Sequence, residues 1–78
     1  MKHAGKAMRE RRESLGLSVR DVGRMLDVSE VTIYSWQSEH AEPSLHYRQE
    51  AYKQGLLPLG ALTGNDADWE TYLTEPAA

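Results

Sequence analysis

The sequence predicts an all-α fold: a compact domain of five short helices with a short C-terminal tail element. Two short helical patterns, residues 19–26 and 30–38, follow one another with almost no chain between them. Each begins after a serine, Ser18 or Ser29, whose hydroxyl can accept from the unpaired amides of a first helical turn. Elsewhere apolar residues recur at helical spacing, and glycines and prolines separate the segments. A chain of 78 residues buries only about 60% of its unfolded surface, so a second core is not expected.

The first helix is expected from residue 4 to residue 14. Its apolar residues are spaced so that they share one side of the helix, and they are Ala4, Ala7, Met8 and Leu15. Gly16 follows this pattern and is expected to end the helix in the left-handed conformation, which glycine adopts without a steric cost.

The next two patterns predict a helix-turn-helix. Their apolar residues, including one in the turn, are Val22, Met25, Leu26, Val28, Ile33 and Trp36. Gly23 lies in the middle of the first of these helices, where glycine costs about 1 kcal/mol relative to alanine. We therefore expect another backbone segment to pass close to Gly23. The alternative is a pair of ordinary helices in a small bundle.

Two more helices are expected after a loop over residues 38–43. Ser44 is expected to cap a helix over residues 45–54 that ends at Gly55, and Pro58 fits the first turn of a short fifth helix through Leu62. The residues expected to be buried here are Leu45, Ala51, Tyr52, Leu56, Leu57, Leu59 and Leu62.

The C-terminal segment supports two interpretations. Trp69, Tyr72 and Leu73 recur at i, i+3 and i+4 after an Asn65 or Asp66 cap, which favours a short amphipathic helix. Alternation of Trp69, Thr71 and Leu73 favours a strand instead. We expect the helix, with its apolar face on its own domain or on a second copy, and assign dimerisation to Trp69, Tyr72 and Leu73. The predicted division is a domain over residues 1–64 and an acidic tail over residues 65–78, of which 74–78 are expected to be a loose end.

The charges are distributed unevenly along the chain. The net charge is −3, yet all nine Lys and Arg residues lie within residues 1–53. Residues 1–24 hold seven bases against three acids, a local balance of +4, whereas residues 56–78 hold four acids and no base. Such a dipolar chain can present its basic end to phosphates while its acidic end stays away from them. The alternative is that the arginine-rich first helix is only a solvated face.

Several segments in order resemble a known family. They are Met8–Ser18, the small Gly23, the buried aliphatic Ile33, the bulky Trp36, Glu42-Pro-Ser-Leu45 and Leu62-Thr-Gly64. With these residues the chain from Met8 to Gly64 resembles the lambda-repressor-like, or Cro/XRE-type, helix-turn-helix family of transcriptional regulators. The resemblance implies a compact five-helix lambda-repressor-like DNA-binding domain.

The resemblance also implies a DNA-binding surface, with the helix over residues 30–38 in the major groove. The positions that would read bases are Glu30, Val31, Tyr34 and Ser35. Glu30 can accept from the amines of cytosine or adenine, and Val31 offers an apolar surface to the thymine methyl group. The positions that would contact phosphates are Arg20, Arg24, Ser29, Thr32, Ser38 and His40.

Some positions need a separate interpretation. Arg12 matches a family arginine that pairs with a glutamate at the end of the third helix, but that position is Gln37 here. Arg12 is therefore either structural, through a hydrogen bond to Gln37, or a phosphate ligand. The family's usual glutamine and glycine are replaced by Val19 and Asp27, and Glu30 and Glu39 make the recognition helix acidic. Weak nonspecific DNA binding is expected.

Other functions are not indicated. No Gly-rich phosphate loop and no catalytic constellation is present, so an enzyme is not expected. The chain has no cysteine, and the spacing of His40 and His46 with Glu39 and Glu42 fits no metal site. No cofactor, small-molecule ligand or membrane partner is expected, and the location is expected to be the cytoplasm.

The sequence thus predicts a sequence-specific DNA-binding regulator. The expected activity is repression of phage or mobile-element promoters, including its own, by a homodimer bound to a double-stranded operator. The alternative is a protein–protein interaction module or antitoxin that keeps the helix-turn-helix fold with little DNA contact.

Overall fold

A computed structural model describes residues 3–73, and this part of the chain is all-helical, as predicted. Its elements are α1 (Ala4–Ser14), α2 (Val19–Leu26), α3 (Glu30–Gln37), α4 (Leu45–Lys53), α5 (Gly60–Thr63) and the 3-10 helix η1 (Asp66–Asp68). The predicted bounds of α1 and α2 are confirmed, α3 and α4 each end one residue earlier than expected, and α5 begins at Gly60. Residues 74–78 of the expected tail lie outside the described residues.

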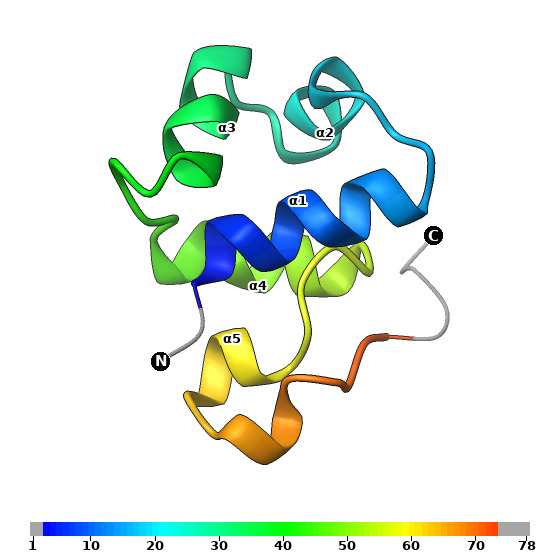
Figure 1. The fold of residues 1–78 in the computed structure, drawn as a ribbon, viewed down its shortest axis with the longest axis vertical. Coiled ribbons are helices and arrows are strands. Elements are labelled where there is room, and N and C mark those ends of the chain that lie inside the picture. Colours follow the sequence, from blue (N-terminus) through cyan, green and yellow to red (C-terminus); the bar gives the residue numbers. More distant parts are fainter. Residues whose placement is uncertain (1–2, 74–78) are drawn as a thin grey trace.

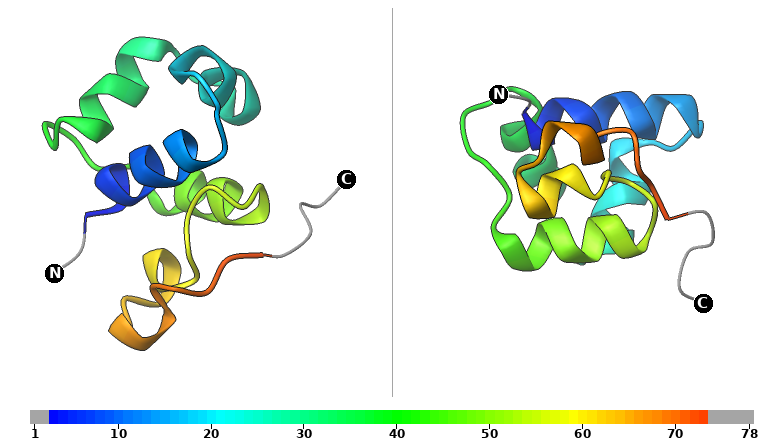
Figure 2. Two further views of the ribbon diagram at one scale, coloured as in Figure 1. Left: turned by 45° about the vertical axis from the view of Figure 1, so that its right-hand side comes forward. Right: turned by 90° about the horizontal axis from the view of Figure 1, so that it is seen from below.

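The helices surround a single core. In Figure 1, α2 and α3 lie on one side of α1, and α5 and η1 lie on the opposite side. Helix α3 contacts both α1 and α2, while α4 contacts α2 and α5. Seen from below, α5 and η1 lie between α1 and α4 and cover that side of the molecule (Figure 2). The α2–turn–α3 unit is therefore held from behind by α1 and α4.

The core contains most of the apolar residues expected there. Its most deeply buried side chains are Met8, Val22, Ile33, Leu56, Leu57 and Pro58. The predicted burial of Leu15 and Leu45 was wrong, because both side chains are exposed at helix ends. Leu17 packs against the core beyond the end of α1, and the Tyr47 ring lies 5.5 Å from the Trp36 ring beside the start of α4.

Local hydrogen bonds set the geometry of the helix-turn-helix. The Ser18 hydroxyl accepts from the Asp21 amide, and the Asp21 carboxylate accepts from the Ser18 amide at 2.9 Å, which forms a capping box at α2. Asp27 ends α2 in the left-handed conformation with φ 56°. A Cβ atom on Gly23 would lie 2.9 Å from the Val28 carbonyl oxygen, so the expected close approach at Gly23 is confirmed. Ser44 was expected to cap α4, but its side chain makes no capping hydrogen bond.

The capping box predicts a pH-dependent contribution to stability. The hydrogen bond from the Ser18 amide, with a smaller contribution from the Ser18 side chain, lowers the pKa of Asp21 below its usual value. A carboxyl whose folded pKa is lowered stabilises the fold above its unfolded pKa of about 3.9, and this contribution is lost as the pH falls through the folded pKa.

We expect Asp21→Asn to unfold at a lower urea concentration than the wild type at pH 7. The difference should shrink below about pH 4 and disappear once the wild-type carboxyl is protonated. Urea titrations followed by circular dichroism at pH 7, 4 and 2.5 measure this. A difference that stayed constant over this range would show that the carboxylate charge makes no contribution.

The C-terminal segment differs from both interpretations of its sequence. Asn65 does cap a helix by accepting from the Ala67 amide, but η1 covers only three residues, and Thr71–Leu73 form neither a helix nor a strand. Trp69 is only 9% exposed and packs on Gly60 of its own chain. The Leu59 amide donates to the Thr71 carbonyl at 2.6 Å. The prediction of an amphipathic helix was wrong. The path of this segment is determined instead by its contacts with Leu59 and Gly60, at the start of α5.

Candidate nucleic-acid interface

Helix α3 has a buried side and an open side. Ile33 and Trp36 are buried in the core, whereas Val31 is 77% exposed and Tyr34 is 57% exposed on the other side of the helix. Glu30 is exposed as well, and Ser35 is half-buried. Within residues 3–73 no hydrogen bond or ion pair engages the Glu30 or Tyr34 side chain. The open side thus presents one acceptor, one apolar group and one hydroxyl.

The start of α3 is organised by two hydroxyl groups. The Ser29 hydroxyl caps the helix by accepting from the Thr32 amide at 3.2 Å, and it lies 2.9 Å from the Thr32 hydroxyl. The contact between the hydroxyls uses only one of their two protons, so the other can be donated to an external acceptor. Arg20 and Arg24 of α2 line the same shallow pocket of about 440 Å³ as Ser29. Two arginines and Ser29 therefore meet beside the start of α3, in a pocket that Asp27 and Glu30 also line.

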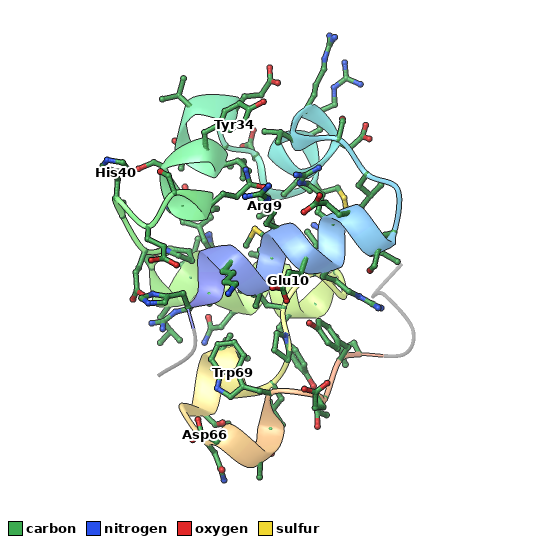
Figure 3. All side chains as sticks on the ribbon, in the orientation of Figure 1. Arg9, Glu10, Tyr34, His40, Asp66 and Trp69 are labelled. Atoms are coloured by element: carbon green, nitrogen blue, oxygen red, sulfur yellow. The ribbon has the colours of Figure 1, made fainter. Side chains whose placement is uncertain are left out.

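The end of α3 is held by the Ser35 carbonyl. This oxygen accepts from the amides of His40 and Ala41 and from the Ser38 hydroxyl. The Ser38 oxygen also lies 2.8 Å from Nδ1 of His40, so Ser38 and His40 form a pair just beyond the helix. Figure 3 shows Tyr34 on α3 and His40 on the turn that follows it.

Arg12 has the structural contact that one interpretation of the sequence requires. Its Nε donates to Oε1 of Gln37 at 3.1 Å, and its Nη1 donates to the Leu17 carbonyl at 2.9 Å. Arg12 therefore connects α1 both to the end of α3 and to the turn before α2. Of the two interpretations left open by the sequence, the structure contains the hydrogen bond to Gln37 in place of the family's ion pair.

Sequence reasoning missed Arg9 as part of this surface. Arg9 and Arg12 of α1 line a shallow pocket of about 280 Å³ together with Tyr34, Gln37 and Ser38. A signal was present in the sequence, because residues three apart share one face of a helix, so Arg9 had to lie beside Arg12. That the face of α1 with Arg9 and Arg12 lies beside α3 follows only from the packing of the two helices.

The other sequence-based expectations concern metals and membranes. His3 lies 3.8 Å from Glu39 and 3.5 Å from Glu42, measured between ring nitrogens and carboxylate oxygens. Among residues 3–73, no three His, Cys, Asp or Glu side chains are placed to hold a metal ion. None of the helices in that range combines the length and the apolar run that crossing a membrane requires.

A comparison with protein families gives one match. The model of a family described as helix-turn-helix matches residues 8–47, which are 40 of the 78 residues of the chain. The match covers most of α1, all of α2 and α3, and the start of α4. No curated protein and no solved structure gives a significant match.

Proposed function

The chain belongs to the Cro/C1-type helix-turn-helix family of DNA-binding transcription regulators, and on this premise we propose that it is a sequence-specific repressor. Its targets would be promoters of a phage or mobile element, its own included. Such promoters lie in the cytoplasm of a bacterial host, so we propose a cytoplasmic location for the protein.

The open side of α3 is the observation that supports sequence-specific binding. In helix-turn-helix proteins the second helix of the motif enters the major groove. We propose that Glu30 accepts from the exocyclic amine of cytosine or adenine and that Val31 packs on a thymine methyl group. Tyr34 and Ser35 complete the proposed base-reading set. Glu30, Val31 and Tyr34 suit this role because they are exposed, whereas Ser35 is half-buried.

Phosphate contacts are proposed on both sides of α3. Arg20, Arg24 and the free hydroxyl proton of the Ser29–Thr32 pair lie beside its start, so they suit one strand of the DNA backbone. The pair formed by Ser38 and His40 lies beyond its end. These contacts hold the domain in register on the duplex without reading its sequence.

The repressor is proposed to act as a homodimer on two half-sites about 34 Å apart, because a second copy multiplies the modest affinity of one small domain. Of the residues assigned to dimerisation, Trp69 is used in the core of its own chain and would act by holding the segment in place. Tyr72 and Leu73 are half-buried and leave part of their surface for a partner. The molar mass at micromolar concentration measures this directly.

Arg20→Ala provides the test of the proposed DNA contact. We expect this variant to bind all DNA sequences more weakly by a similar factor and to lower the slope of log affinity against log salt by about 1. Fluorescence polarisation with the DNA upstream of the protein's own gene, and with a scrambled duplex, at two salt concentrations measures both effects. A loss confined to the upstream DNA would instead assign Arg20 to base reading.

One observation favours the alternative of a protein-binding module or antitoxin. No lysine or arginine lies between residues 25 and 47, so α3 itself carries no cation, and the net charge of the chain is −3. If the wild type bound no promoter fragment at any salt concentration and instead formed a stable complex with a partner protein, the repressor proposal would be overturned.

A further inference from the structure

We propose that the pocket between α1 and α3 binds a phosphate of the DNA backbone and that Arg9 supplies its cation. This pocket, here called the α1–α3 groove, is lined by Arg9, Arg12, Tyr34, Gln37 and Ser38. The inference rests on the proposed function, since it assigns a second phosphate site to the same DNA-binding surface.

Arg9 is the cation in this groove that keeps both terminal guanidinium nitrogens free of hydrogen bonds within the described residues 3–73. Its Nε donates to Oε1 of Glu13 at 3.2 Å, which occupies one of the five N–H groups of the guanidinium. Arg12 uses two of its five N–H groups, one on Nε and one on Nη1, to bind Gln37 and the Leu17 carbonyl, so one of its terminal nitrogens is already engaged. The terminal nitrogens of Arg9 therefore keep the fork that binds two phosphate oxygens at once.

The position of the groove points to the DNA backbone as the source of the phosphate. Tyr34 belongs both to the open side of α3 and to the wall of the groove, so a phosphate bound there borders the major groove that α3 would enter. Figure 3 shows Arg9 between α1 and α3, on the same side of the molecule as Tyr34. Ser38 also lines this groove, with its hydroxyl engaged by the Ser35 carbonyl and by His40.

The charge distribution around α3 favours a phosphate-binding role for Arg9. Helix α3 has no lysine or arginine, so phosphates beside it must be neutralised from neighbouring helices. Arg20 and Arg24 of α2 provide this only beside the start of α3. The α1–α3 groove lies along its second half, where Tyr34, Gln37 and Ser38 line it. Arg9 would thus neutralise the strand on the other side of the major groove.

Lys53 offers a matched control for Arg9. Its side chain is 59% exposed against 57% for Arg9, and it also pairs with a carboxylate on its own helix, Glu50 at 3.4 Å. It lies at the end of α4 and lines neither of the two pockets described above beside α3. Arg9→Ala and Lys53→Ala change the net charge equally, so a difference between them reports the location of the charge.

The experiment measures binding of the upstream DNA by fluorescence polarisation between 50 and 200 mM salt. We expect Arg9→Ala to bind about tenfold more weakly, as the loss of a hydrogen bond between charged groups does, and to lower the salt slope by about 0.9. Lys53→Ala should match the wild type. Glu13→Gln should bind about twofold more tightly, because it releases Arg9 from a surface ion pair. Arg9→Lys should fall between the wild type and Arg9→Ala, since it keeps the charge and loses the fork.

Failure of the inference and failure of the proposed function give different results. Wild-type binding with an unchanged affinity and salt slope in Arg9→Ala would overturn the role of Arg9 alone. Equal losses in Arg9→Ala and Lys53→Ala would do the same, because net charge would then explain them. Absence of DNA binding by the wild type would overturn both proposals. Circular dichroism of each variant checks the fold, and Glu13→Gln and Arg9→Lys carry the test if Arg9→Ala fails to fold.

Discussion

Gly5→Ala is expected to lower the free energy of unfolding by about 3 kcal/mol or more, the upper end of the cost of overpacking a core. A Cβ atom on Gly5 would overlap the carbonyl group of Trp36, which is backbone and cannot turn aside as a side chain can. The first turn of α1 would have to move away from the end of α3. For a domain of this size the melting temperature should fall by more than about 12 °C.

The sign of the change in the free energy of unfolding shows whether packing or helix propensity dominates in Gly5→Ala. Alanine is favoured over glycine inside a helix by about 1 kcal/mol, so propensity alone predicts that Gly5→Ala stabilises the protein. Gly16→Ala is the matched control, because Gly16 has φ 71° and a Cβ atom there would meet no atom within 4 Å. Its cost should be about 1 kcal/mol, from the left-handed backbone only. If thermal and urea unfolding found Gly5→Ala as stable as the wild type, the close approach of α1 and α3 would be wrong.

Tyr34→Ala is expected to reduce the preference for one operator sequence strongly. A base contact of this kind accounts for about 1–3 kcal/mol of discrimination, so the ratio of affinities for the operator and a scrambled duplex should fall by roughly 5- to 150-fold. Binding to the scrambled duplex should change much less, because the arginines of α1 and α2 remain. Competition polarisation with both duplexes measures the ratio.

Tyr34→Phe is the control for this prediction, because it keeps the ring and removes only the hydroxyl. An intermediate ratio in Tyr34→Phe would divide the preference between a hydrogen bond and the apolar contact of the ring. If Tyr34→Ala kept the full preference for the operator, the proposed register of α3 in the major groove would be wrong.

The sequence predicted those features of the fold that depend on neighbouring residues. Serines at Ser18 and Ser29 mark the starts of α2 and α3, because capping involves only the next three residues. Burial at helix ends was harder to predict, as Leu15 and Leu45 show, because it depends on where the chain goes next. The path of the C-terminal segment depends on Gly60, which leaves room for Trp69 and is not adjacent to it in the sequence.

In the candidate site, too, the sequence predicted what depends on neighbouring residues and missed what depends on contacts between helices. Periodicity places Ile33 and Trp36 in the core, and the opposite, exposed face of α3 follows from them. Arg9 was missed because its relevance depends on how α1 crosses α3. That crossing depends in turn on the close approach at Gly5, which no local pattern in the sequence indicates.

The contact between Arg12 and Gln37 should make the fold insensitive to salt where α1 meets α3. Its acceptor is a neutral amide, so the contact has no carboxylate to protonate in acid, and added salt screens it less than it would screen two opposite charges. The seam between α1 and the end of α3 should therefore keep its geometry across a salt titration. A fall in DNA affinity with salt then reports the counterions displaced from the duplex, because the structure of the protein does not change with the salt concentration.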